Sequence, residues 1–221
     1  MPETQIYIPE YVRPEKSRPQ STSAKKHVPK LGNPTPLGLS AFAMCVMMAS
    51  LYNLGAFKVA QPTVLIAISL FSGGVVQFAS GMWEFRVGNT FGGTGFSAFG
   101  GFWASYALIL QEYIDKPIDQ QFHRTVGIFC LVWLIFTFIF TLACIRTNMG
   151  VLSAFVFLTL SIAGEVIYHL TDGDTDFFIK LAGGTGLACS FSVWYCLAGV
   201  LLTPDLSPIS LPLWDLSQKN D

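Results

Sequence analysis

The chain alternates between long runs without any charged residue and short links that contain charges. The six runs cover residues 31–57, 59–83, 87–111, 125–145, 147–164 and 181–204. Each run is close to or above the roughly 20 apolar residues with which an α-helix crosses a bilayer. Because hydrocarbon offers the backbone no hydrogen-bond partners, such segments are expected to be helical. The pattern predicts an all-α membrane protein with six transmembrane helices, and the short links predict that neighbouring helices are antiparallel.

The composition agrees with a membrane protein and argues against several other classes. Of the 221 residues, 52% are hydrophobic and only 12% are charged, whereas soluble domains carry about 25% charged residues. The net charge of −1 leaves no basic excess for nucleic acid. The sequence contains no phosphate-binding loop, HExxH motif or catalytic set, so we expect no enzyme activity, no metal and no cofactor. The cysteines lie in apolar runs without ligand spacing and are interpreted as small core residues: Cys45, Cys130, Cys144, Cys189 and Cys196.

The flanking segments and the basic residues predict the domain organisation. Residues 1–32 are polar and rich in proline, which predicts a disordered tail. Residues 33–204 form the six-helix domain, and residues 205–221 form a second short tail. Cytoplasmic loops carry an excess of Lys and Arg, and nine of these residues lie on the side of the termini against four on the other side. Both termini are therefore predicted to be cytoplasmic.

The third run is rich in glycine between residues 89 and 101. Glycine costs a helix about 1 kcal/mol relative to alanine, so this helix needs close packing with its neighbours. Ser69 with Gly73, and Ser97 with Gly101, form small faces that allow two helices to approach closely. Two interpretations remain open and are compatible: tight packing alone, or a helix, whole or half-broken, beside a narrow pore.

Three ionisable residues are close to or inside the apolar runs. Glu84 follows the second run, where it is either an interfacial residue or part of the inner mouth of a pore. Glu165 and His169 are four residues apart and share one helix face. They are either a pair that reaches toward the outer interface or a proton relay, because ionisable groups within membrane helices are often functional. The other polar residues inside the runs are small and neutral, which suits a small solute.

The motif Asn-Pro-Thr-Pro-Leu-Gly-Leu at residues 33–39 marks the start of the membrane domain. Asn33 and Thr35 each precede a proline, and such residues cap the free N–H groups of a first helical turn. A fixed helix N-terminus of this kind favours anions. By itself the motif gives only a weak indication that a carboxylate is attracted there.

Together with YNLG at residues 52–55 and the segment at 71–103, this motif resembles the acetate uptake transporters, also called succinate–acetate permeases. The polar N-terminal tail is similar to that of fungal-type members. The resemblance implies a six-helix protomer with its own central pore, assembled as a homo-hexamer among the lipids of the plasma membrane. It also implies passage of acetate and related short-chain monocarboxylates, with coupling to protons.

The resemblance further implies a pore pinched by Phe, Tyr and Leu. These positions correspond to Phe42, to Phe99 and to Leu160, the last in an alignment that can shift by two residues. Phe99 departs from the family pattern because it lacks the tyrosine hydroxyl. An apolar constriction gates by dewetting, so this sequence predicts either a preference for protonated acids or a shifted substrate range. Asn33, Thr35 and Glu84 are expected near the inner mouth.

Two other functions remain open at this point. The first is an ammonium or ammonia exporter built on the same fold. The second is a non-transporting membrane sensor or scaffold, which would give no flux in liposomes and would act through residues 1–32.

Overall fold

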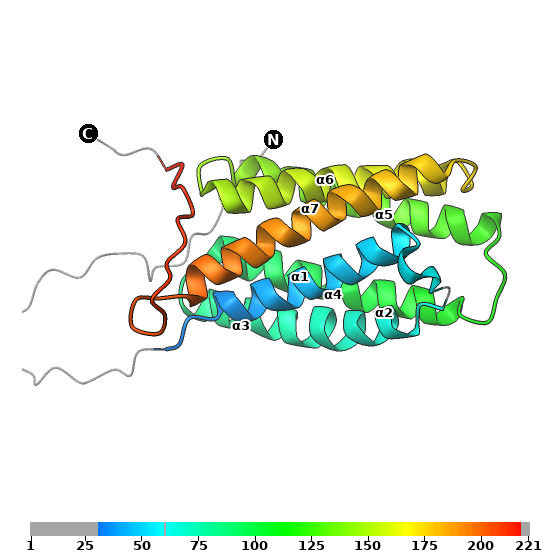
Figure 1. Cartoon of the computed structure of the whole chain (residues 1–221). Coiled ribbons are helices and arrows are strands. Elements are labelled where there is room, and N and C mark those ends of the chain that lie inside the picture. The colour runs from blue at the N-terminus through cyan, green and yellow to red at the C-terminus, as the bar shows by residue number, and fades with distance from the viewer. Residues whose placement is uncertain (1–30, 60, 218–221) are drawn as a thin grey trace, which may run out of the picture. The chain divides into compact units, whose positions relative to one another are not determined.

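The computed structural model of the chain describes residues 31–59 and 61–217, so nearly all of the tail predicted at residues 1–32 lies outside the described residues. Six long helices dominate the described part (Figure 1). The second of them is continuous from Thr63 to Arg86 and is assigned in three sections. The elements are α1 (Thr35–Asn53), the short 3₁₀ turn η2 (Ala56–Lys58), α2 (Thr63–Ile68), the π-helical η3 (Ser69–Val76), α3 (Gln77–Arg86), α4 (Thr90–Glu112), α5 (Gln120–Ala143), α6 (Met149–Leu170) and α7 (Asp176–Leu201).

The starts of three helices are fixed by side-chain caps. Asn89, Asp119 and Asn148 each accept a hydrogen bond from a backbone N–H in the first turn of α4, α5 and α6. These caps satisfy N–H groups that have no partner within the helix. Polar residues in the links of the sequence therefore set where α4, α5 and α6 begin.

Five of the six long helices are apolar and long enough to cross a membrane. The helix outside this set is α4, whose glycines and small polar residues lower its hydropathy. It is nevertheless continuous over 23 residues, so the half-broken helix considered from the sequence is not seen. The chain is a multi-pass integral membrane protein, as the charge-free runs predict.

The six helices pack side by side around a common interior. Helix α1 lies against α7 and against the long helix from Thr63 to Arg86, α7 packs on α6, and α6 packs on α5. Helix α4 packs closely on the long helix. Its seam with α5 has few close backbone approaches and is instead bridged by aromatic pairs such as Phe91–Phe140 and Phe99–Phe136. For reference, the end of the bundle where α1 begins and α7 ends is called the terminal end, and the opposite end is called the far end (Figure 1).

Small residues allow the long helix to approach α4. A Cβ atom added to Gly73 would lie 2.5 Å from Cβ of Trp103, and one added to Gly81 would lie 2.2 Å from Oγ of Ser97. Both distances are far below van der Waals contact, so only glycine fits at either position. Gly101, by contrast, is exposed and has no neighbouring atom within 4 Å of an added Cβ. The predicted small face of α4 therefore packs within the protomer through Ser97 but not through Gly101.

Candidate functional site: two cavities and a shared constriction

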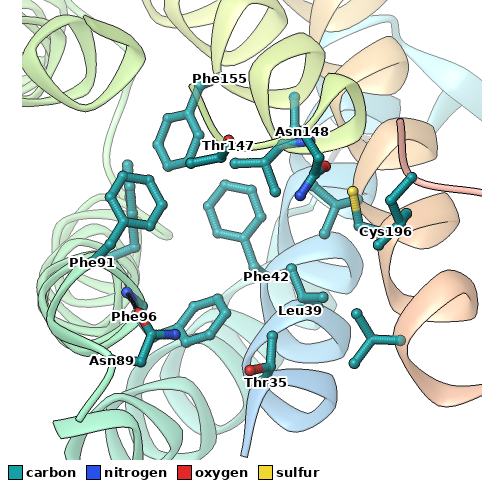
Figure 2. Close-up of a pocket in the computed structure, with 18 of the residues that line it drawn as sticks. Thr35, Leu39, Phe42, Asn89, Phe91, Phe96, Thr147, Asn148, Phe155 and Cys196 are labelled. Atoms are coloured by element: carbon teal, nitrogen blue, oxygen red, sulfur yellow. Dashed lines mark hydrogen bonds between the residues drawn. The ribbon is translucent and has the colours of Figure 1, made fainter. Parts of the chain in front are cut away.

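A cavity of about 340 Å³ lies inside the bundle toward its terminal end (Figure 2). We call it the entrance cavity. Its wall is mostly apolar, with a few polar side chains where the helices begin. The lining residues are Thr35, Leu39, Phe42, Asn89, Phe91, Gly92, Gly95, Phe96, Phe99, Thr147, Asn148, Val151, Ala154, Phe155, Leu158, Val193, Cys196, Val200 and Leu213.

A second, smaller cavity of about 40 Å³ lies deeper in the bundle and is called the inner cavity. Its polar lining consists of Ser50, Ser161, Glu165 and the indole of Trp103. Three residues line both cavities: Phe42, Phe99 and Leu158. These side chains therefore stand where the two cavities meet, and together they form the constriction.

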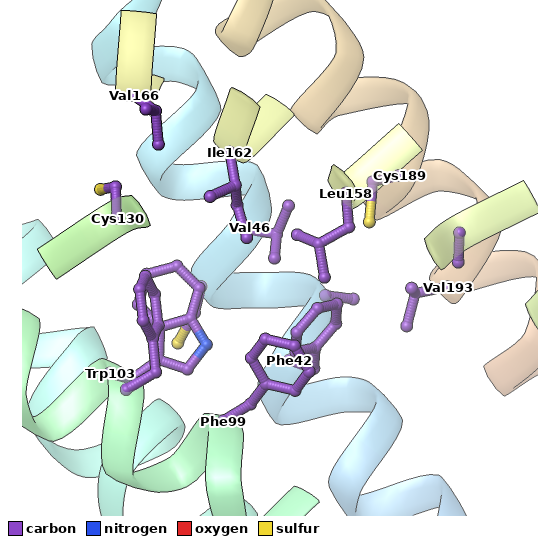
Figure 3. Packing of buried hydrophobic residues seen from close by; sticks show 14 of the residues in the cluster. Phe42, Val46, Phe99, Trp103, Cys130, Leu158, Ile162, Val166, Cys189 and Val193 are labelled. Carbon is purple, nitrogen blue, oxygen red and sulfur yellow. The ribbon is translucent and has the colours of Figure 1, made fainter. Parts of the chain in front are cut away.

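The constriction consists of two aromatic rings and one aliphatic side chain. The ring centroids of Phe42 and Phe99 are 5.3 Å apart at an interplanar angle of 68°, an edge-to-face arrangement that aromatic pairs prefer. Phe42, Phe99 and Leu158 are 8%, 3% and 6% exposed, and all three belong to the buried cluster in Figure 3. Two aromatic rings of α5 pack against Phe99, with centroid distances of 5.6 Å for Phe136 and 5.9 Å for Trp133. The constriction offers no hydrogen-bonding group.

The structure places Leu158, and not the expected Leu160, beside the two rings. Leu160 is 50% exposed and lines neither cavity. The reason is helix periodicity, because residues three, four and seven positions apart share one face of an α-helix. Leu158, Ser161 and Glu165 of α6 follow this spacing and all line the inner cavity. Leu158 is the residue that the two-residue shift allowed in the sequence alignment would select.

At the terminal end, Glu84 joins the ends of three helices. It is 1% exposed. Its Oε1 accepts a 2.5 Å hydrogen bond from the Thr35 hydroxyl at the start of α1. Its Oε2 accepts a 2.7 Å bond from the Asn89 side-chain amide, which also caps α4. Gly92 makes room for this group, because a Cβ there would lie 2.5 Å from Nδ2 of Asn89.

Two of the three residues expected at this mouth are thus brought together. Thr35 lines the entrance cavity and binds Glu84, whereas Asn33 is exposed and accepts a 3.0 Å hydrogen bond from the Thr35 backbone N–H. Asn89 was not predicted from the sequence as a residue of this mouth. Its position immediately before the glycine-rich run is a cap signal that could have identified it.

We expect the Glu84 cluster to stabilise the fold. Glu84→Ala leaves the Thr35 hydroxyl and the Asn89 amide without their shared partner, and should lower the free energy of unfolding by about 2–4 kcal/mol. Glu84→Gln keeps an acceptor for the Asn89 amide and can donate its own amide N–H to the Thr35 hydroxyl, so it loses only the charge and its loss should be the smaller one. Thermal unfolding of the purified protein in detergent would rank the variants. Glu112→Ala, at an exposed carboxyl group on α4, is the control, and a Glu84→Ala melting temperature equal to that of the control would contradict this role.

At the far end, the two residues predicted as a proton relay have different partners. Glu165 accepts a 2.8 Å hydrogen bond from the Asn53 side chain and a 3.5 Å contact from the Cys130 thiol. His169 lies 3.1 Å from His123, measured between their Nδ1 atoms. Glu165 lines the inner cavity, whereas His169 lines neither the entrance cavity nor the inner cavity. The geometry therefore places Glu165 at the inner cavity and gives no direct contact between it and His169.

The described residues contain no group of three or more His, Cys, Asp or Glu side chains that could hold a metal ion. The site instead consists of an entrance cavity with a polar mouth, an apolar constriction and a small inner cavity that is lined by a carboxyl group. Such an arrangement can select a small solute by size and by its hydration.

Known proteins are similar to this chain in sequence. Acetate permease A of Emericella nidulans is 35% identical over 185 residues, which is 77% of this chain and 62% of the relative. This chain thus spans less than two thirds of that relative's length. Ammonia transport outward protein 2 of Saccharomyces cerevisiae is 33% identical over 198 residues, covering 84% of this chain and 68% of the relative. Succinate-acetate/proton symporter SatP of Escherichia coli is 31% identical over 184 residues, covering 83% and 96%.

The fold itself matches a solved structure. The structure of the bacterial acetate channel SatP superimposes with a TM-score of 0.74 at 31% identity, covering 83% of this chain and 99% of the channel chain. The family model described as GPR1/FUN34/yaaH matches residues 16–218, which is most of the sequence. The six-helix bundle, the motif at residues 33–39 and these matches agree, and the chain belongs to the GPR1/FUN34/yaaH family.

Proposed function

We propose that this protein carries acetate and related short-chain monocarboxylates across a membrane through the pathway between the two cavities. The observation that carries the proposal is the shared constriction, where Phe42, Phe99 and Leu158 separate the entrance cavity from the inner cavity. The relatives named as an acetate permease, a succinate-acetate/proton symporter and an acetate channel support the choice of solute.

The chemistry of the constriction favours the protonated acid. Moving an isolated carboxylate into a site without partners costs far more than moving a neutral group, and narrow apolar segments expel water. A solute that sheds its charge before the rings and regains it beyond them would move together with a proton. We therefore propose that flux depends on protons, that Thr35 and Glu84 shape the mouth, and that Glu165 faces the solute beyond the constriction.

The proposal includes the cellular arrangement expected from the sequence. Both termini would face the cytoplasm, the protein would lie in the plasma membrane, and six copies would assemble, each with its own pore. The exposed apolar side chains of the outer helix faces, such as Phe71, Ile128 and Phe191, are suited to lipid or to a neighbouring copy.

The decisive test is uptake of labelled acetate into proteoliposomes. We expect uptake above that of protein-free liposomes, and a further several-fold increase when the outside is made more acidic than the inside. Absence of uptake under both conditions would contradict transport and would favour a sensor.

A second candidate is export of ammonia, favoured by the similarity to Ammonia transport outward protein 2. Neutral ammonia, like a neutral acid, could cross an apolar constriction. Release of ammonia from loaded proteoliposomes, measured beside acetate uptake in the same preparation, distinguishes the two. Ammonia release without acetate uptake would replace the first proposal with this one.

A further inference from the structure

The segment after α7 turns back across the terminal end of the bundle instead of leaving it. Figure 1 shows this segment in orange-red to red, passing the end where α1 begins and α7 ends. We call residues 207–217 the C-terminal strap. The Met149 backbone N–H donates a 3.0 Å hydrogen bond to the Trp214 carbonyl, and the Leu216 N–H donates a 2.9 Å bond to the Thr147 carbonyl. These bonds pair the strap with the link between α5 and α6.

A second attachment joins the strap to α7. The Tyr195 hydroxyl donates a 2.7 Å hydrogen bond to the Pro212 carbonyl. The ring of Tyr195 also stacks on Trp214, with centroids 5.8 Å apart and planes within 8° of parallel. Trp214 has φ of +49°, a conformation that is unfavourable for a bulky residue. It is retained here because bonds on either side of it fix the chain.

The two attachments place Leu213 against the helices. A Cβ added to Gly199 would lie 2.7 Å from Cδ2 of Leu213, and one added to Gly150 would lie 3.9 Å from the same atom. Gly199 on α7 therefore leaves the room that Leu213 occupies, and Gly150 on α6 lies at ordinary van der Waals distance from the same side chain. Leu213 is also the only lining residue of the entrance cavity that comes from outside the six helices and the links between them.

We propose that Leu213 is a specificity-determining residue, and that the C-terminal strap sets how long an acid the entrance cavity accepts. The inference rests on the proposed function. Leu213 lines the entrance cavity together with Thr147 and Val200, and all three belong to the terminal end of the bundle, from which a solute would enter. An alkyl tail of one carbon passes beside it, and a longer tail meets its isobutyl group. The strap is thus a wall of the substrate route.

The test compares uptake of labelled acetate and butyrate by proteoliposomes that contain the full chain. Discrimination by a hydrophobic wall is worth about tenfold or more per methylene. Because butyrate is longer than acetate by two methylenes, Leu213→Ala should raise the ratio of butyrate to acetate uptake by about tenfold to a hundredfold, and Leu213→Phe should lower it, while acetate uptake persists in both. Tyr195→Phe, which removes only the bond to Pro212, should raise the ratio by a smaller factor.

Ile209→Ala is the matched control, because Ile209 is an aliphatic strap residue that is 58% exposed and lines no cavity described here. Its ratio should equal that of the unmodified protein. An unchanged ratio in both Leu213 variants, or an equal rise in Ile209→Ala, would overturn the inference while leaving acetate transport in place. Failure of the unmodified protein to take up acetate would instead overturn the proposed function, and the inference with it.

Discussion

Phe99→Tyr should raise acetate flux near pH 7 by about tenfold or more, and change it by less than about twofold near pH 4. The tyrosine hydroxyl would supply a hydrogen-bond donor at a constriction that has none, and a bond to a charged acceptor is worth about 1.5–3 kcal/mol. Simple carboxyl groups titrate near pH 4.3. The ionised acid therefore dominates near pH 7, where the new donor helps, and the neutral acid is abundant near pH 4, where it helps little. Initial uptake rates in proteoliposomes across this range would measure the effect.

The control is Phe136→Tyr. The ring centroids of Phe136 and Phe99 are 5.6 Å apart, but Phe136 lines neither cavity. The substitution Phe136→Tyr therefore adds the same hydroxyl beside the constriction but outside the proposed pathway. Its pH profile should match that of the unmodified protein. If Phe99→Tyr left both the rate and the pH profile unchanged, the idea that the lost hydroxyl favours protonated acids would be wrong.

Leu158→Ala should increase acetate flux near pH 7 by about tenfold, whereas Leu160→Ala should leave it within about twofold. Dewetting of an apolar constriction depends on its width, and removing the Leu158 side chain would let water and the ionised acid enter. The two residues lie on the same helix but on different faces, with exposures of 6% and 50%. Paired uptake measurements at equal protein content would compare them.

The thermal stability of Leu158→Ala and Leu160→Ala provides a second comparison of the two positions. Truncation of a buried leucine costs about 2–5 kcal/mol, so Leu158→Ala should melt at a lower temperature than Leu160→Ala. If Leu160→Ala changed the flux and Leu158→Ala did not, Leu158 would have no place in the constriction. The two cavities would then not form the transport route.

The sequence alone determined the membrane architecture. Six runs without charge, bounded by polar links, can satisfy their backbone in lipid only as helices, and the structure contains six long helices at these places. Local signals also set details, because Asn89, Asp119 and Asn148 are short polar side chains that cap the helices following them. The motif at residues 33–39 and the segment at 71–103 identified the family.

The length of each helix, and the face that it turns toward the interior, were harder to predict from the sequence. The fifth run was placed at residues 147–164, but α6 continues to Leu170. Its ionisable residues remain inside the bundle because Glu165 binds Asn53 on α1 and His169 contacts His123 on α5. The choice between Leu158 and Leu160 likewise depended on which face of α6 turns inward, and an apolar run that is hydrophobic on all sides does not reveal that face.

The tertiary structure decided the site itself. Thr35 and Glu84 are 49 positions apart in the sequence, and no local sequence pattern predicts the hydrogen bond between their side chains. The strap was predicted only as a tail, since its hydrogen bonds to residues 147–149 and its contact with Gly199 join segments that no periodicity connects. A helix forms because its segment is apolar and its backbone hydrogen bonds are made within the segment. Both properties depend on residues that are close in the sequence. A pathway between helices follows from which side chains meet across them, and only the packed bundle sets that arrangement.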